Sequence, residues 1–337
     1  MSSACVRPIT APQSSLTRTG ELLSRSGAGR YWPVWLLVAP ILAWTVIRVF
    51  GLERGYPLVG LMAFTPCVAL AALLATGVAV ALRNWAAATV AALATVCLGA
   101  AVLPRVVGSE LESPVGHQTV TVLAANIHHG TADPAALVAL VERLRPDLLS
   151  VEELTPRFAR ELRAEGIDRL LPESHLAVHT NVSGSGLYAR HPLRAMPEPT
   201  RFQFRMPRAL MVLPGGRSLR VVGVHPYPPL RGRVDEWSAA LGSLPTAGSG
   251  APWVLPGDFN ATLDLAEFRG LIGSGYRDAA DAAGKGLEPT WPVGHTMPPL
   301  IAIDHVLVDR RLGIAAYGVL DLPGSDHRAI YARLVLP

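Results

Sequence analysis

The sequence contains few cysteines, the residues that cross-link small secreted domains, and few charged residues. Its 337 residues include three cysteines, Cys5, Cys67 and Cys97, all in the first third of the chain, so no disulfide framework can hold the remainder together. Only one lysine, Lys285, is present, and charged residues make up 17% of the chain, below the usual share of about a quarter. Hydrophobic residues make up 50%, which excludes a disordered chain and points to a membrane component.

The few charges are unevenly distributed. Residues 1–108 contain eight arginines and two glutamates, a net charge of +6, whereas residues 109–337 contain 22 basic and 24 acidic residues, a net charge of −2. The basic character of the chain therefore belongs to its N-terminal part. The large C-terminal part has no excess positive charge, which weighs against a general nucleic-acid-binding protein.

Three long apolar runs follow a polar N-terminal segment. Residues 1–30 are rich in Ser, Thr, Gly and Arg without hydrophobic periodicity, which predicts a flexible tail. The runs cover about residues 31–50, 56–82 and 85–103, and each is near or above the roughly 20 residues that a helix needs to cross a membrane. We therefore predict three transmembrane helices. A cleaved signal peptide fits less well, because no short apolar core with a small-residue cleavage pattern stands out and two further runs follow. The buried helices of a soluble protein also fit less well, because the three runs have almost no polar face.

The placement of arginine predicts the orientation of these spans. The tail carries four arginines against one glutamate, and the turn after the second span is basic at Arg83, whereas acidic residues follow the third span. By the positive-inside rule, the tail lies in the cytoplasm and everything after the third span lies on the extracytoplasmic side of the plasma membrane. Residues 104–118, which include Pro104 and Gly108, are expected to link this multi-pass anchor to a domain outside.

From residue 119 onward, short apolar strands alternate with amphipathic helices. Strands are predicted at 119–125, 148–151, 186–190, 209–213, 219–225, 253–257, 301–308, 314–320 and 329–336. Helices are predicted at 134–144, where Asp133 is a suitable N-cap before Pro134, and around 231–244 and 265–272. This order predicts packed sheets covered by helices, an α/β or α+β layered domain over residues 119–337.

Polar residues gather where the predicted strands begin or end. Those that end or closely follow a strand are Asn126, Glu153, His225, Asp258, Asn260 and Asp304, and the pair Asp326–His327 directly precedes the last strand. Side chains at strand ends can converge on one rim although they are distant in sequence. Oxygen and amide ligands of this kind suit Mg²⁺, with Mn²⁺ as an alternative, whereas a soft metal is disfavoured because this part contains no cysteine.

Six short motifs occur in order along the same part of the chain. They are Leu123–Ile127, Asp147–Leu154, Val224–His225, Gly257–Ala261, Ile303–Val306 and Ser325–His327. Together they resemble the endonuclease/exonuclease/phosphatase superfamily over about residues 119–337, which implies a four-layer α/β sandwich and divalent-metal-dependent hydrolysis of phosphoesters. Three spans ahead of such a domain also resemble the actinobacterial membrane proteins associated with teicoplanin resistance, the VanJ type.

The resemblance implies a set of metal ligands. Glu153 would bind the cation with Asn126 beside it, and Asp326 would be a further ligand. The chain departs from the superfamily at Glu152, where glutamine is common. This glutamate either adds a negative charge near the metal or points away on the other face of its strand.

The resemblance also implies catalytic roles for five residues. Asp258 and Asn260 would orient the attacking water and the phosphate. His327, held by Asp304, would act as the general base or stabilise the charge of the phosphorane. His225 would hydrogen-bond a phosphoryl oxygen or assist the leaving group. Whether Asp258 or His327 is the base stays open at this point.

Each of these residues also has a purely structural interpretation. Asp and Asn favour turns, an acid can begin a helix, and a histidine can be a satisfied member of a core. His128 and His129 lie close enough to Asn126 in sequence to contact a phosphate, although surface histidines are common. Trp291 lies among prolines, where it either lines the cleft or packs as an ordinary core residue.

Three functions follow in order of preference. The first is a membrane-anchored, extracytoplasmic phosphatase or phosphodiesterase that uses Mg²⁺ and acts on a lipid-linked phosphate or pyrophosphate of the cell-wall carrier cycle. The second is a surface nuclease acting on DNA or RNA, against which the net charge of −2 argues because nucleases neutralise phosphates with basic side chains. The third is a non-catalytic protein that binds a glycopeptide or lipid head group. No stable nucleic-acid partner is expected.

Overall fold

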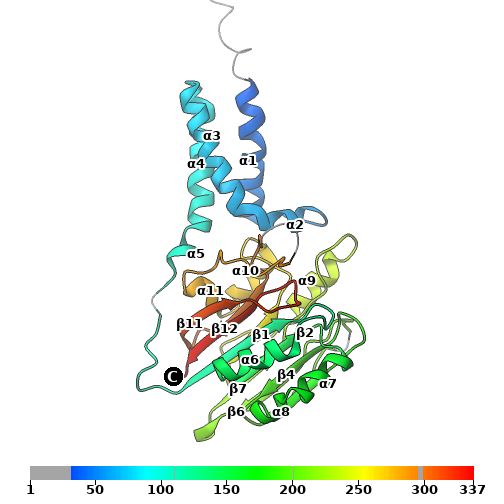
Figure 1. Ribbon diagram of the computed structural model, residues 1–337. Helices are drawn as coiled ribbons and strands as arrows, with labels where there is room; N and C mark the ends of the chain where they lie inside the picture. Colours follow the sequence, from blue (N-terminus) through cyan, green and yellow to red (C-terminus); the bar gives the residue numbers. More distant parts are fainter. Residues whose placement is uncertain (1–31, 110, 200, 295–298) are drawn as a thin grey trace, which may run out of the picture.

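The structure, a computed structural model, describes all residues except 1–31, 110, 200 and 295–298. A bundle of three long helices forms one end of the molecule, and the α/β domain, residues 119–337, forms the other end (Figure 1). The predicted N-terminal tail lies outside the described residues.

The bundle contains the three predicted spans. Its elements are α1 (Trp32–Phe50), α2 (Leu58–Leu61), the short 3-10 helix η2 (Met62–Phe64), α3 (Thr65–Ala81), α4 (Trp85–Val102) and α5 (Pro104–Val107). The helical stretches Trp32–Phe50, Leu58–Ala81 and Trp85–Val107 are long and apolar enough to cross a membrane. The second stretch begins at the α2–η2 segment, residues 58–64, which lies at the end of the bundle that faces the α/β domain (Figure 1).

The α/β domain is built on two six-stranded sheets. The first sheet has the order β11-β12-β1-β2-β4-β3 and the second has the order β5-β6-β7-β8-β10-β9. The strands of the first sheet are β1 (Thr119–Asn126), β2 (Leu148–Glu152), β3 (Glu173–Ala177), β4 (Ser185–Ala189), β11 (Gly313–Leu320) and β12 (Ala329–Val335). Those of the second are β5 (Leu193–Ala195), β6 (Arg208–Val212), β7 (Ser218–Val222), β8 (Trp253–Asp258), β9 (Tyr276–Asp278) and β10 (Asp304–Asp309).

The inner faces of the two sheets pack against each other. Val122 and Leu148 of the first sheet share one buried cluster with Met211, Val254 and Val306 of the second. Alternate residues of a strand point to opposite faces, so the residues next to them face outward. Most of β1 and β2 is buried on both faces, which explains why these strands read as continuous apolar runs.

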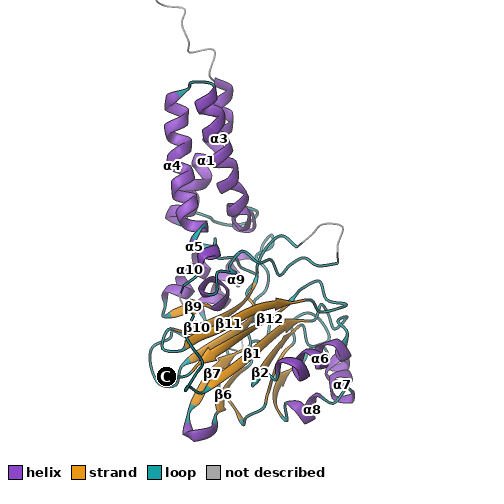
Figure 2. Ribbon diagram, turned by 60° about the vertical axis from the view of Figure 1, so that its left-hand side comes forward, coloured by secondary structure: helices purple, strands orange, loops and turns teal. Residues whose placement is uncertain are grey.

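Helices cover the outer face of each sheet (Figure 2). On the first sheet these are α6 (Pro134–Leu144), α7 (Pro156–Ala164) and α8 (Ile167–Leu170), whose apolar residues join those of β1 and β2 in one cluster. On the second sheet, α9 (Val234–Gly242) and α10 (Ala266–Gly273) bury Trp237 and Phe268 against β7, β8 and β10. The remaining helices are η3 (Pro214–Gly216) and α11 (Ala279–Ala282). The predicted four-layer α/β sandwich is therefore confirmed.

Strong sequence signals correspond to observed elements, and weak ones were missed. Helix α6 covers the predicted residues, and the Asp133 side chain accepts hydrogen bonds from the backbone N–H groups of Ala135 and Ala136. Helix α7 was not predicted because only Phe158 and Leu162 are buried on an otherwise polar helix. Strands β5 and β9 were missed because they are three residues long, and β3 was missed because none of its residues is fully buried.

The segment between the bundle and the α/β domain lies against that domain. Residues 104–118, expected to act as a linker, begin with α5, in which Arg105 is buried. Farther along, the backbone N–H of Ser109 donates to the carbonyl of Ala282, and that of Glu112 donates to the carbonyl of Ile314. The bundle is therefore joined to the α/β domain by hydrogen bonds as well as by the chain.

Candidate active site

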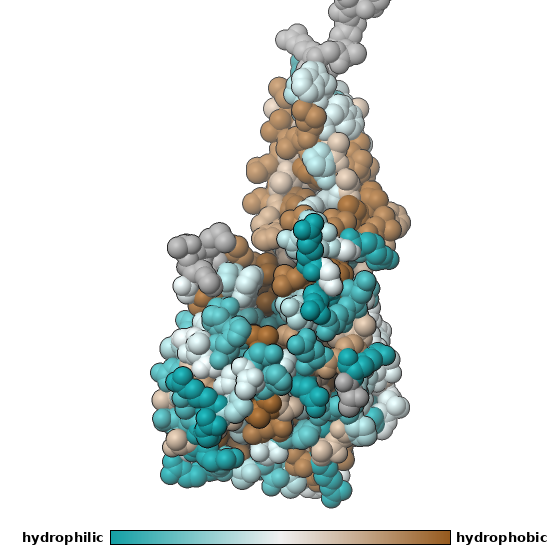
Figure 3. Space-filling view, turned by 90° about the vertical axis from the view of Figure 1, so that its right-hand side faces the viewer, coloured by the Kyte–Doolittle hydropathy of each residue, from teal (hydrophilic) through white to brown (hydrophobic). Residues whose placement is uncertain are grey.

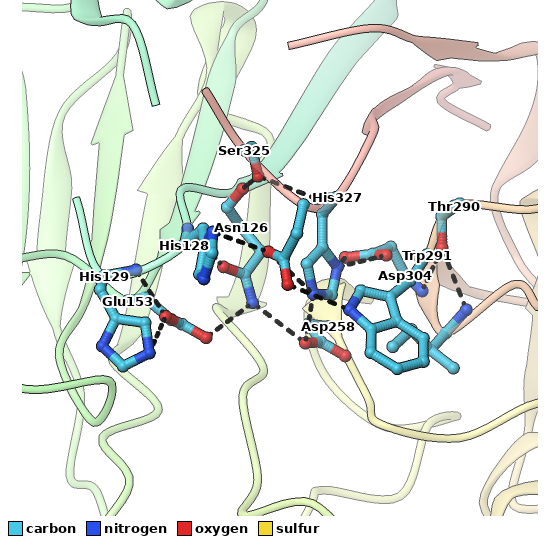
Figure 4. A network of polar contacts seen from close by, with 12 residues as sticks. Asn126, His128, His129, Glu153, Asp258, Thr290, Trp291, Asp304, Ser325 and His327 are labelled. Carbon is cyan, nitrogen blue, oxygen red and sulfur yellow. Dashed lines mark hydrogen bonds and ion pairs between the residues drawn. The ribbon is translucent and has the colours of Figure 1, made fainter. Parts of the chain in front are cut away.

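Strand register brings the predicted residues to one end of the two sheets. In the first sheet, β1 and β2 run parallel with Asn126 opposite Glu152, so Glu153 follows beside Asn126. In the second sheet, β8 and β10 run antiparallel with Asp304 opposite Asp258. The Asn126 Nδ2 donates to Asp258 Oδ2 at 3.1 Å, which joins the two sheets at this end (Figure 4).

The side chain of Asn126 connects three parts of the site. Its Nδ2 also lies 3.3 Å from Glu153 Oε1, and its Oδ1 accepts the backbone N–H of His128 at 3.0 Å. The other oxygen of Glu153 accepts the backbone N–H of His129 at 2.6 Å. These bonds hold the Glu153 carboxylate in one orientation before any ligand binds, so the site is preorganised.

His327 forms a buried pair with Asp304. The His327 Nδ1 lies 2.9 Å from Asp304 Oδ2, and its Nε2 lies 3.8 Å from Asp258 Oδ2. Burial disfavours the charged imidazole, but the neighbouring carboxylates outweigh it, chiefly Asp304, and raise the pKa of His327 to about 10. Without a cation, His327 is therefore an imidazolium at neutral pH, able to donate a hydrogen bond into the site.

The pKa of Asp258 is also raised, but here burial is the main cause. Burial, followed by repulsion from Asp304, raises the pKa of Asp258 to about 7, and hydrogen bonds from Asn260 and Asn126 oppose the shift only partly. A carboxylate with a pKa near neutrality is well placed to accept a proton from water. The geometry thus offers Asp258 as the acceptor and His327 as the donor.

Ser325 positions the last motif. Its Oγ donates to the carbonyl of Asn126 at 2.7 Å and accepts the backbone N–H of His327 at 3.0 Å. Between them, Asp326 accepts a hydrogen bond from the indole Nε1 of Trp291 at 3.2 Å, and its Oδ1 lies 3.5 Å from His128 Nδ1. Trp291 therefore orients a site carboxylate and lines the cleft, which is the first of the two roles that the sequence left open.

His225 is a second histidine close to Asp258. The side chain is buried, and its Nε2 lies 3.7 Å from Asp258 Oδ2 and 4.0 Å from Glu153 Oε1. Burial, with repulsion from His327, lowers the pKa of His225 to about 3, so the imidazole is neutral. Its Nδ1 is buried with no hydrogen-bond partner among the described residues, so the ring can donate from only one side.

Several site residues adopt a backbone conformation that L-residues rarely take. Glu153 has φ of 61°, Asn260 of 49°, and His128 and His129 of 44° and 55°. Such residues are costly in a fold and persist where the surrounding contacts hold them, often at functional sites. The Asn260 conformation is held by its backbone N–H, which donates to Asp258 Oδ1 at 2.8 Å.

The donor set fits a divalent cation. Four carboxylates, Glu153, Asp258, Asp304 and Asp326, line or support the site, and the His327 imidazole lies among them. One oxygen of Asp258, one of Asp304 and one nitrogen of His327 lie within 4.8 Å of one another, close enough to surround an ion. Carboxylate and amide oxygens are the ligands of hard cations. Because Asp304 already binds His327 Nδ1, we still expect Glu153, Asn126 and Asp326 to be the ligands.

The active-site pocket has a volume of about 410 Å³. Six of the predicted residues line it: Glu153, His225, Asp258, Asn260, Asp326 and His327. Asn126 and Asp304 lie behind them and are hydrogen-bonded to them. The lining also includes His128, His129 and Trp291, and, unexpectedly, Val59, Gly60 and Ala63 of the α2–η2 segment. No motif could have revealed this last group, because small apolar residues at the end of a span carry no distinctive pattern.

The structure also settles where Glu152 lies. Its side chain is fully buried between the sheets, with Oε1 2.5 Å from Ser150 Oγ. A Cβ on Gly257 would lie 3.0 Å from the same oxygen, so glycine leaves room for the carboxyl group. Burial, reinforced by Asp304 and Asp258, raises the pKa of Glu152 well above its usual value. Burial therefore favours the neutral form of Glu152, which resembles the glutamine common at this position.

Comparisons with known proteins agree with this geometry. Residues 123–327 match the endonuclease/exonuclease/phosphatase family. Among solved structures, D. rerio TDP2 complexed with a single-strand DNA product is 17% identical, with a TM-score of 0.53 over 64% of this chain and 99% of that one. A humanized D. rerio TDP2 with 14 mutations is 18% identical, with a TM-score of 0.52 over 64% of this chain and 98% of that one.

No curated protein matches the chain. The solved structures are similar in fold, and the family match covers more than half of the sequence, including the polar residues that line the pocket but not Val59, Gly60 and Ala63. Family members are metal-dependent phosphoester hydrolases, in keeping with the carboxylates and the His327–Asp304 pair. The chain belongs to the endonuclease/exonuclease/phosphatase family.

Proposed function

We propose that this protein is a membrane-anchored phosphoesterase that uses a divalent metal, preferably Mg²⁺, outside the cytoplasm. Its substrate is a lipid-linked phosphate or pyrophosphate of the cell-wall carrier cycle, and its action confers teicoplanin-type resistance. One observation carries the proposal. The pocket that contains the catalytic residues is completed by the α2–η2 segment, which leads directly into a membrane-spanning helix.

Each side chain of the site has its own role in the proposed hydrolysis. Asp258 accepts a proton from the attacking water, and Asn260 orients the phosphoryl group beside it. His327 donates a hydrogen bond to a phosphoryl oxygen, and Asp304 keeps its imidazole oriented and charged. His225 is neutral and donates toward the same group or the leaving oxygen. A bound cation supplies positive charge for the phosphoryl oxygens.

The lining of the pocket favours a small anionic head group over a polynucleotide. Its basic members among the described residues are the histidines 128, 129, 225 and 327, and it includes no arginine or lysine. Nucleases depend on basic side chains to neutralise successive phosphates. The TDP2 structure with single-strand DNA is the observation that keeps a nuclease as the second candidate.

The arrangement of the bundle supports an extracytoplasmic site. The start of α1 and the turn between α3 and α4 lie at one end of the bundle, and the α/β domain lies at the other (Figure 1). The turn carries Arg83, and the arginines of the tail precede α1. The positive-inside rule then assigns that end to the cytoplasm.

Hydrolysis of a purified lipid tests the activity. Full-length protein in detergent is incubated with undecaprenyl pyrophosphate, and released phosphate is measured. We expect turnover that depends on Mg²⁺, stops with a chelator and is lost in Asp258→Ala. Cleavage of single- or double-stranded DNA, with no turnover of any lipid phosphate, would favour the nuclease instead.

Two further measurements test the location and the need for catalysis. A topology reporter fused after Pro337 is expected to be active outside the cytoplasm, and a cytoplasmic signal would exclude the wall-precursor substrate. Cells that carry Glu153→Ala are expected to lose teicoplanin resistance. Resistance retained by that variant would support a binding protein that does not hydrolyse its ligand.

A further inference from the structure

The active-site pocket has two chemically different walls. The polar wall is formed by Asp258, His327 and the other catalytic residues. The apolar wall includes the following lining residues: Val59, Ala63, Tyr227, Leu230, Leu265 and Ile301. In Figure 3 the apolar surface of the bundle continues down to its junction with the α/β domain.

The α2–η2 segment belongs to both parts of the molecule. Val59 and Met62 are buried in the same apolar cluster as Trp237 and Phe268 of the α/β domain. Gly60 and Leu61, between them, are exposed, and the chain continues into α3, within the second membrane-spanning stretch. The apolar wall is therefore placed where the head groups of a bilayer meet its hydrocarbon.

A buried group of charges fixes this wall against the catalytic loop. Asp264, four residues after Asn260, accepts two hydrogen bonds from Arg105 at 2.9 and 2.6 Å and one from Arg48 at 3.1 Å. Glu53, in the loop before α2, accepts the backbone N–H of Ala266 at 2.5 Å. Because α1 and α5 are tied to one carboxylate, the α2–η2 segment is held in place against the loop that follows Asp258.

We propose that the apolar wall at Val59, Gly60 and Ala63 is a subsite for the hydrocarbon chain of a membrane lipid. The chain passes between the α2–η2 segment and the Tyr227–Leu230 loop while its phosphate lies on the polar wall. This inference rests on the proposed function and adds the part of the substrate that the enzyme recognises. A chain that remains against an apolar surface avoids contact with water while the head group enters the pocket.

Gly60 offers a direct test of the subsite. It lines the pocket, its φ lies outside the left-handed region, and a Cβ built on it would meet no atom within 4 Å. Gly60→Leu and Gly60→Trp therefore place a side chain in the proposed path without straining the backbone. Leu61→Trp is the matched control, because Leu61 is the exposed neighbour in α2 and does not line the pocket.

Two substrates are compared for each variant in full-length protein: undecaprenyl pyrophosphate and the soluble diester bis(p-nitrophenyl) phosphate. We expect kcat/KM for the lipid to fall about 10-fold or more from wild type to Gly60→Trp, with Gly60→Leu between them, while the diester changes less than about 2-fold. Leu61→Trp is expected to resemble wild type on both substrates.

The outcomes separate this inference from the proposed function. Lipid turnover that is unchanged in both Gly60 variants overturns the subsite and leaves the phosphoesterase in place. Equal losses on lipid and diester in Gly60→Leu also overturn it, because the wall would then serve catalysis in general. Wild-type protein that cleaves the diester but no lipid phosphate overturns both proposals.

Discussion

The bundle and the α/β domain bury opposite kinds of residue. In the bundle, the buried positions are dominated by alanine, as at Ala75 and Ala91, while Leu73 and Val96 are 56% and 67% exposed. In the α/β domain, the largest side chains are the most buried, as at Trp237. The apolar side chains of the bundle thus face outward, whereas those of the domain face inward.

The difference is the one expected if the bundle crosses a membrane, as we propose, while the α/β domain lies in water. Hydrocarbon is as apolar as leucine, so helices in a membrane gain little by burying large side chains and instead pack closely through small ones. The hydrogen bond between Thr76 Oγ1 and Thr95 Oγ1, 3.1 Å across α3 and α4, adds the kind of polar contact found in such bundles. In water, burial of apolar area drives folding instead.

Between the bundle and the α/β domain lies a layer of buried charged residues, which is packed in neither of these two ways. Arg48, Arg105 and Asp264 are all buried at the junction, although buried charges are rare unless paired. Here two arginines share one carboxylate, and Arg269 donates to the carbonyls of Asp264 and Arg48. The junction therefore depends on polar contacts where the bundle and the domain depend on apolar ones.

The largest effect is expected on catalytic activity, from a variant that should leave the packing of the bundle unchanged. His327→Ala is expected to lower kcat about 1000-fold, within the range of a lost acid–base group, because the imidazolium beside Asp304 would be absent. The helix content and the unfolding temperature of the bundle should stay unchanged. A variant that unfolds as well would show that the pair serves mainly to stabilise the domain.

The next prediction concerns the junction. Asp264→Ala removes the partner of two buried arginines and is expected to lower the free energy of unfolding by about 3 kcal/mol, measured in detergent with denaturant. Arg233→Ala, which breaks an exposed pair with Glu236, is the control and should cost less than about 1 kcal/mol. Equal effects of the two variants would contradict a special role for the buried charges.

A third prediction applies to the bundle alone. Ala91→Leu is expected to lower the free energy of unfolding by about 1–3 kcal/mol, because a buried alanine between helices leaves no space for a larger side chain. Leu93→Ala, at a position that is 61% exposed, should change it much less. The reverse order would mean that Leu93 faces another helix rather than lipid.

The smallest effect is expected inside the α/β domain. Glu152→Gln should change stability by less than about 1 kcal/mol and leave kcat nearly unchanged, because the raised pKa already keeps Glu152 neutral and glutamine keeps its hydrogen bond to Ser150. Thermal unfolding and hydrolysis of the soluble diester measure both. A large loss of activity would indicate that Glu152 is charged when the metal is bound.

Much of the fold could be predicted because its signals are local. The three apolar runs, the N-cap at Asp133 and the short strands around Asn126 and Asp258 each depend on residues adjacent in sequence. The order of six motifs was enough to select the residues that the fold then brings together. The polar helix α7 and the short edge strands were missed because tertiary contacts, more than periodicity, hold them.

The sequence by itself determined which polar residues form the site and which segments are long and apolar enough to cross a membrane, since motif order and the length of an apolar run are properties of the chain. Only the tertiary structure decided how they act. It favoured the neutral form of Glu152 by burial, charged His327 through Asp304, and placed Gly60 of α2 in the same pocket as Asp258 of β8, far along the chain. The physical reason is that burial and electrostatic coupling depend on distances in space, which neighbouring residues in a sequence do not encode.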